Sequence, residues 1–152
     1  LTDHFAGGQP LGHDFTRQLV QTSSRGSANV EAVTGEPFEE LVAHWQLANY
    51  VEDLPDFTPL DPRLQYTSWA FRDLYQSNFE LGVFPKPYPL TPLVTANGAV
   101  GLAGTLRGGS GVHLRIVQPA SAAGLELKLT AGDGASTVDD GVKPRIALVR
   151  IR

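Results

Sequence analysis

The sequence predicts an α+β protein, with an N-terminal helical subdomain followed by a small antiparallel β-sandwich-like domain. Apolar residues recur at helical spacing in the first half, and apolar and polar residues alternate in the second half. Between the halves, the stretch FPKPYPLTPL carries four prolines, which favour extended chain. We therefore expect a helical subdomain at residues 1–79, a Pro-rich linker at residues 80–92 and a β domain at residues 93–152.

Two short helices are expected first. Residues 14–22 place Phe15, Leu19 and Val20 at helical spacing before a polar break. Residues 28–33 form the second helix, with Ser27 as a plausible N-cap and Gly35 just past the end. We therefore expect Gly35 to end the second helix before the third begins.

The third helix, at residues 38–50, has the strongest signals. Pro37 suits a helix start, and glutamates beside it lie near the positive end of the helix dipole. One apolar stripe follows, consisting of Phe38, Leu41, Val42, Trp45 and Ala48. Prolines then forbid a continuous helix after Tyr50, and Ser68 is a candidate cap for a short helix at residues 69–76.

The second half predicts strands with one buried face. Apolar and polar residues alternate at residues 112–117, 125–129 and 145–151. The Gly-rich stretch at residues 94–106 offers one or two further strands. Glycine-rich turns separate these runs, which favours a small antiparallel sandwich.

Composition and charge exclude several functions. The 152 residues contain no Cys, which rules out disulfides, thiolate metal sites and cysteine nucleophiles. Residues 1–95 hold five Lys or Arg and twelve Asp or Glu, a net charge of −7, whereas residues 96–152 hold seven and four, a net charge of +3. The scattered basic residues form no patch for nucleic acid, and no stretch reaches the ~20 apolar residues of a membrane span. Because the chain opens on Leu1 without Met, we expect a fragment.

The search for metal ligands yields weak candidates. The four histidines show no His-Glu-x-x-His spacing. Glu40 and His44 lie one helical turn apart, so they could supply two metal ligands. The simpler interpretation is an ion pair on the solvent side of the helix. Candidate ligands also flank a Gly-rich turn near the N-terminus, where the simpler interpretation is a loop and a helix cap; they are Asp3, His4, His13 and Asp14. Asp133, Asp139 and Asp140 could bind calcium through their carboxylate oxygens. We favour the alternative interpretation, in which they belong to a solvated hairpin loop.

Other motifs are incomplete. The glycines at residues 102–111 lack the Lys-Ser/Thr of a P-loop, and Ser110 lacks the second glycine of a nucleophile elbow. Pro89 and Pro92 match a minimal proline-recognition motif, but a structural linker is the simpler interpretation. We therefore assign no catalytic, cofactor-binding or metal-binding residue in this chain.

Residues 2–76 resemble the region downstream of the active site in secreted bacterial zinc metallopeptidases of the hyicolysin type, within the gluzincin group. The resemblance is carried by DHFAGG, by the run from FTRQLV to NYVED, and by QYTSWAFRDLY. In that family, the His-Glu-x-x-His helix and a later glutamate ligand lie in an N-terminal part. Those residues have no counterpart here, so any zinc belongs to the parent protein.

The resemblance implies a non-catalytic C-terminal part of a secreted metallopeptidase-like protein. Its helical subdomain would brace an upstream zinc domain of the same polypeptide, and its β domain would be an accessory module. An alternative is a surface module that recognises a protein or glycan without an enzymatic parent, although the β half has no aromatic residue after Tyr88 to stack on sugars. A structural spacer is a third possibility.

Overall fold

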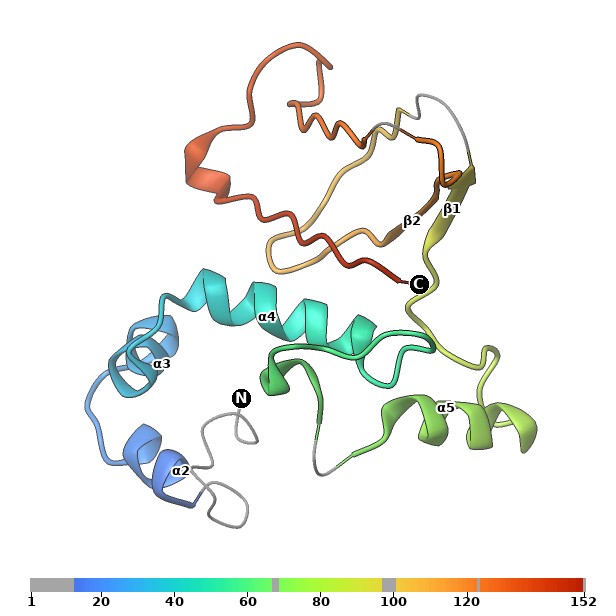
Figure 1. The fold of residues 1–152 in the computed structure, drawn as a ribbon. Coiled ribbons are helices and arrows are strands. Elements are labelled where there is room, and N and C mark those ends of the chain that lie inside the picture. Colours follow the sequence, from blue (N-terminus) through green and yellow to red (C-terminus); the bar gives the residue numbers. More distant parts are fainter. Residues whose placement is uncertain (1–12, 67–68, 97–100, 123, 152) are drawn as a thin grey trace. The chain divides into compact units, whose positions relative to one another are not determined.

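The computed structural model describes residues 13–66, 69–96, 101–122 and 124–151 (Figure 1). These residues fall into two compact units. The helical unit consists of the described residues up to residue 89 together with residues 147–151, and the strand unit consists of the described residues of 90–146. The predicted domain limits at residues 79 and 93 stay a prediction.

Four α-helices form the described part of the helical unit. They are α2 (His13–Val20), α3 (Gly26–Thr34), α4 (Phe38–Val51) and α5 (Phe71–Glu80), with the 3-10 turn η2 (Pro62–Leu64) before α5. The predicted glycine stop is present, because Gly35 caps α3 at a φ of 71° and its N–H donates to the Glu31 carbonyl at 2.8 Å. Glycine enters this left-handed region at little cost.

The start of α4 is fixed by the preceding helix. Pro37 occupies the N-cap position with a φ of −57°, a value its ring favours. The N–H of Phe38 is one of the donors that a helix start leaves without an internal partner. It donates to Glu31 Oε1 at 2.8 Å, so a side chain of α3 caps α4. Glu39 and Glu40 add negative charge to this first turn.

The core of the helical unit lies along one side of α4. The buried apolar side chains among the described residues are Phe15, Leu41, Ala48 and Val51. Such burial contributes roughly 1.5–3 kcal/mol for a side chain of the size of Leu or Phe. The single predicted stripe is divided in the structure, because Phe38 remains 37% exposed and Trp45 remains 50% exposed.

The last helix, α5, begins two residues later and ends four residues later than the predicted helix at residues 69–76. The N–H of Phe71 at its start donates to the carboxylate of Glu52 at 3.1 and 3.2 Å. Its end is a Schellman motif, in which the Val83 N–H donates to the Asn78 carbonyl and Gly82 has a φ of 72°. The sequence signal at Ser68 lies outside the described residues.

The strand unit contains a two-stranded parallel sheet instead of the predicted antiparallel sandwich. The strands are β1 (Leu93–Ala96) and β2 (Leu114–Val117), and Leu93 is the register partner of Leu114. The short 3-10 turn η3 (Asp140–Val142) follows. The fold is therefore dominated by helices, and the β-sandwich prediction is wrong for the residues that the structure describes.

The sandwich prediction failed because alternation does not specify pairing. Residues 125–129 and 145–151 form no strand, and the three leucines of the first segment remain 40–49% exposed. A strand needs a neighbour to satisfy its backbone, and strand propensity depends strongly on that context. The third alternating segment, at residues 112–117, contains β2, which pairs with β1.

Candidate functional site

The most organised polar cluster surrounds the C-terminal end of α4. We call it the α4 clasp and define it as Asn49, Glu52, Tyr66, Arg72 and Tyr88. Each of Tyr66, Arg72 and Tyr88 donates a hydrogen bond to the last turn of α4 or to the residue after it. The carbonyl groups at a helix end lack internal partners, so side chains from elsewhere stabilise them.

Glu52 is the buried carboxylate of the clasp. Only 1% of its surface is exposed, and both side-chain oxygens accept from the Phe71 N–H. Burial raises the pKa of Glu52, because a charged carboxylate is less stable away from water; the Phe71 hydrogen bond partly opposes this shift. The neighbouring charges also act in both directions, since Asp53 and Asp73 raise the pKa and Arg72 lowers it.

Arg72 links α5 to the end of α4. Its Nε donates to the Glu52 carbonyl at 2.6 Å, and another guanidinium nitrogen donates to the Tyr50 carbonyl. The guanidinium carbon lies 4.3 Å from the centre of the Tyr88 ring, a cation–π contact. A cation at this position also complements the negative end of the α4 dipole.

Tyr88 and Tyr66 complete the clasp. The Tyr88 hydroxyl donates to the Asn49 carbonyl, and the Tyr66 hydroxyl donates to Asn49 Oδ1 at 2.6 Å. Burial raises the pKa of Tyr88, so its hydroxyl stays protonated as a donor. The clasp therefore ties three separate chain segments to one helix end.

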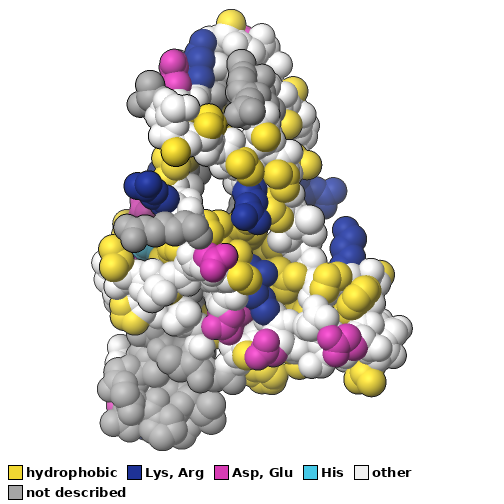
Figure 2. All heavy atoms as spheres, turned by 45° about the vertical axis from the view of Figure 1, so that its right-hand side comes forward, with side chains coloured by type: hydrophobic (Ala, Val, Ile, Leu, Met, Phe, Trp, Pro, Cys, Tyr) yellow, Lys and Arg dark blue, Asp and Glu magenta, His cyan; other side chains and the backbone are white. Residues whose placement is uncertain are grey.

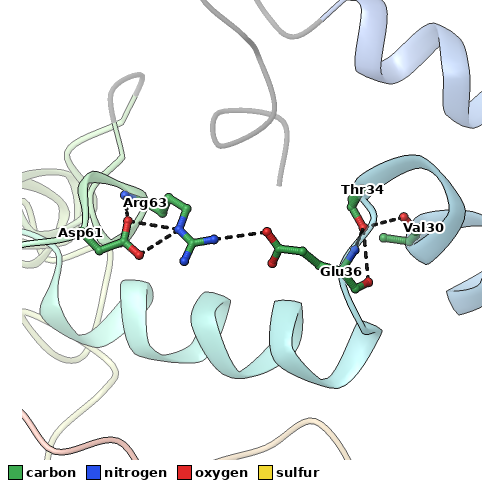
Figure 3. A network of polar contacts seen from close by, with 5 residues as sticks. All are labelled: Val30, Thr34, Glu36, Asp61 and Arg63. Atoms are coloured by element: carbon green, nitrogen blue, oxygen red, sulfur yellow. Dashed lines mark hydrogen bonds and ion pairs between the residues drawn. The ribbon is translucent and has the colours of Figure 1, made fainter.

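A second polar network runs alongside α4 and joins the turn before it to the start of η2 (Figure 3). Arg63 contacts Glu36 Oε1 at 3.2 Å and Asp61 Oδ2 at 2.8 Å. Hydrogen bonds from the backbone N–H and the guanidinium of Arg63 hold the pKa of Asp61 below its usual value. On the other side of Glu36, the Thr34 hydroxyl donates to the Val30 carbonyl at 2.8 Å and accepts from the Glu36 N–H. This network fixes the turn between α3 and α4.

Neither network is arranged for catalysis. A buried carboxylate with a raised pKa is a common feature of general acids, so Glu52 is the first residue to consider. Its two oxygens, however, face the backbone N–H at the start of α5. A surface depression is lined by Glu31, Gly35, Glu36 and Pro37, but both carboxylates there already bind Phe38 N–H or Arg63. The hydrogen bonds and ion pairs of Glu31, Glu36 and Glu52 therefore hold helix ends and turns in place.

The candidate metal ligands do not gather in the part of the chain that the structure describes. Within residues 13–66, 69–96, 101–122 and 124–151, no group of three or more His, Asp or Glu side chains is placed to hold a metal. Glu40 and His44 both lie on α4, and Asp14 forms an exposed ion pair with Arg17 at 3.4 Å. Asp3 and His4 lie outside the described residues.

The acidic and glycine-rich loops of the strand unit form local turns. Asp133 accepts hydrogen bonds from the Ser136 hydroxyl and from the Ala135 and Ser136 N–H groups, which lower its pKa to about 2. Asp139 accepts from the Gly141 N–H at 2.7 Å at the start of η3. The Ser110 hydroxyl donates to the Arg107 carbonyl at 2.6 Å, also within a turn.

Sequence reasoning missed the clasp. Arg72 is 20 residues beyond Glu52, and Tyr88 is 39 residues beyond Asn49. None of these residues belongs to a motif that indicates a contact between distant positions. The one available signal was Glu52 directly after the end of an amphipathic helix, and it does not identify a distant partner.

Three further findings bear on function. No helix among the described residues has the length and apolar character required to cross a bilayer. The sequence matches no family model, no curated protein and no solved structure. The resemblance to metallopeptidases therefore receives no support from these comparisons and rests on the residues quoted for it.

Proposed function

We propose that this chain is a non-catalytic accessory part of a larger secreted protein, in which the helical unit braces a neighbouring folded domain. The observation that carries the proposal is the apolar face of α4 formed by Phe38 and Trp45. These residues are seven positions apart, or about two helical turns, so they share one side of the helix. They remain 37% and 50% exposed although the adjacent Leu41 is buried.

Exposed apolar residues are also frequent elsewhere in the described chain. Figure 2 shows many hydrophobic side chains open to solvent on one face. In the helical unit, Trp69 is 60% exposed and Leu81 is 77% exposed. Single exposed apolar residues need no explanation, but aromatic residues with accessible faces are enriched where proteins dock. The proposed bracing contact removes the α4 apolar face from water.

The proposed neighbour is a zinc-dependent domain of a metallopeptidase-like protein. The resemblance of residues 2–76 to hyicolysin-type enzymes supports this choice. The strand unit is then an accessory module. A coding sequence without a zinc-hydrolase motif in the one domain upstream, some ~150–200 residues, would exclude this choice of neighbour.

Binding to that neighbour tests the bracing role. The domain encoded directly upstream is expressed separately, and its affinity for this chain is measured by titration calorimetry. We expect Trp45→Ala to weaken binding about tenfold or more, because truncating a buried aromatic anchor costs about 2 kcal/mol. Val20→Ala is the matched control, since Val20 is 74% exposed but lies on α2, and it should leave the affinity unchanged.

Fluorescence locates the contact independently. The chain has two tryptophans, so Trp69→Phe leaves Trp45 as the single indole, which is excited selectively at wavelengths that the tyrosines do not absorb. We expect its emission to shift to shorter wavelength when the neighbour binds, because the indole leaves water. Binding without that shift, and without loss of affinity in Trp45→Ala, would contradict the α4 apolar face as the contact.

A further inference from the structure

Residues 125–129 of the strand unit, with the sequence LELKL, have the pattern of a strand but no partner among the described residues. They lie in neither a helix nor a strand, and none of their backbone groups hydrogen-bonds to another residue that the structure describes. None of them has a positive φ, so the backbone enters a strand without leaving a left-handed conformation. The segment therefore offers a row of backbone donors and acceptors to an added strand.

The side chains of this segment divide by type. In an extended chain, alternate residues point to the same side, so the three leucines share one side and the two charged residues share the other. Leu125, Leu127 and Leu129 are 40%, 43% and 49% exposed. Glu126 and Lys128 are also exposed, and neither forms an ion pair in the part of the chain that the structure describes. Both sides are thus accessible to a partner.

The order of the charges narrows the choice of partner. Alternation alone is compatible with many partner strands, but LELKL is complementary to itself when two copies run antiparallel. With Leu127 opposite the same residue of the second copy, Glu126 of each copy lies opposite Lys128 of the other. Opposite charges directly across an antiparallel pair stabilise it. Leu125 then lies opposite Leu129, so the apolar sides of the two copies combine.

Other arrangements of two copies are less favourable. A shift of the antiparallel register by one residue places leucines opposite charged residues, so the apolar sides no longer meet. A shift by two residues places Glu126 opposite Glu126 or Lys128 opposite Lys128, and parallel pairing in register also places like charges opposite each other. The alternating segment at residues 145–151 lacks self-complementary charges, because both of its charged residues are arginines.

We propose that residues 125–129 pair with the same segment of a second copy of this chain, as two antiparallel strands related by a twofold axis at Leu127. The interface is isologous, because each copy contributes the same residues. Pairing satisfies backbone groups and brings the leucine side chains of the two copies together. The contact is short, so we expect a weak dimer that is populated at high protein concentration. It is separate from the α4 apolar face and does not depend on the bracing role.

Disulfide cross-linking in a glutathione redox buffer tests the pairing and its register. The chain has no native Cys, so each introduced cysteine is unique. Leu127→Cys places two thiols on strand positions whose Cα atoms are about 4.5–5.5 Å apart, which a disulfide spans. Leu125→Cys is the matched control, because its two copies lie roughly 13 Å apart along the strands. We expect a several-fold higher yield of linked dimer for Leu127→Cys, and a mixture of Leu125→Cys with Leu129→Cys should give mainly the mixed disulfide, identified by peptide mass spectrometry.

The charged residues provide an independent test in the Leu127→Cys background. Glu126→Lys alone and Lys128→Glu alone each place like charges opposite each other, so we expect either variant to cross-link about fivefold less. When the two single variants are mixed, opposite charges face each other again, and the variants should cross-link to one another. The chain with both substitutions is the matched control, because it restores opposite charges between two identical copies.

Two results would overturn the proposal. One is an equal cross-linking yield for Leu127→Cys and Leu125→Cys, since collisions between chains without a fixed register would explain it. The other is a mixture of the Glu126→Lys and Lys128→Glu variants that cross-links no better than either variant alone, since a second copy would then not be the partner of this segment. Far-ultraviolet circular dichroism of each variant confirms that the helices remain folded, so a lower yield reports weaker pairing.

Discussion

At the scale of single residues, Glu52 is the buried carboxylate that connects two helices. It is 1% exposed and joins the end of α4 to the start of α5 through the Phe71 N–H. Burying a carboxylate costs free energy, and the raised pKa of Glu52 expresses that cost. The hydrogen bond is kept because an unpaired buried N–H at the helix start would also destabilise the fold.

The raised pKa of Glu52 predicts a pH dependence of stability. Between the unfolded and folded pKa values, the folded state binds more protons than the unfolded state, so the free energy of unfolding falls as pH rises. This contribution is present in full below the unfolded pKa and is lost as pH passes the folded pKa. We expect Glu52→Gln, which keeps an acceptor for Phe71, to gain stability relative to the unmodified chain as pH rises above about 4.3, the ordinary pKa of a glutamate carboxyl.

Denaturant unfolding at several pH values measures this difference. Glu80→Gln is the control, because it makes the same chemical change at an exposed position at the end of α5. Glu52→Ala removes the acceptor entirely and should cost about 2 kcal/mol or more at every pH. A constant difference between Glu52→Gln and the unmodified chain would show that burial does not govern this carboxylate.

At the scale of elements, local signals predicted the helices better than they predicted the strands. The end of α3 at Gly35 and the start of α4 after Pro37 depend on residues within seven positions of each boundary. The start of α5 at Phe71 depends on Glu52, 19 residues earlier. The prediction from local sequence therefore placed this helix start at the wrong residue. Strand pairing is also non-local, and the alternation at residues 125–129 contained no information about a partner.

The boundary between α3 and α4 provides a test at this scale. Gly35 has a φ of 71°, and a Cβ added there meets nothing within 4 Å, so the cost of a side chain is that of the backbone conformation alone. We expect Gly35→Ala to destabilise the helical unit by about 1 kcal/mol. Gly35→Asn should cost less, because Asn tolerates the left-handed region better.

Thermal unfolding followed by circular dichroism measures both variants. Gly132→Ala is a control of the same chemical change at a glycine with open space and no positive φ. It should leave the helical transition unchanged. An equal loss of stability for Gly35→Ala and Gly35→Asn would contradict a conformational origin of the cost.

At the scale of the whole molecule, the two units are organised to different degrees. The buried apolar residues identified among the described residues all belong to the helical unit. In the strand unit, β1 and β2 have four residues each, and most of their side chains are exposed. A pair of short strands without a covering layer is marginally stable in water.

Amide hydrogen exchange should reveal this difference. We expect the slowest exchange in α4, whose inner side is buried, and exchange close to the unprotected rate in β1 and β2. The measurement is repeated at a tenfold lower protein concentration to separate intrinsic protection from self-association. Equal protection of β1 and α4 at both concentrations would show that the strand unit is as stable as the helical unit.

The alternation of residues 84–89 has a consequence for the lifetime of the chain among proteases. Phe84, Lys86 and Tyr88 belong to the types after which chymotrypsin-like and trypsin-like enzymes cut, yet each is followed by proline. A proline directly after the cleavage position has no N–H and a fixed φ, and such bonds are poor substrates for those enzymes. The segment that follows α5 therefore offers those enzymes poor cutting positions, even though Lys86 is exposed.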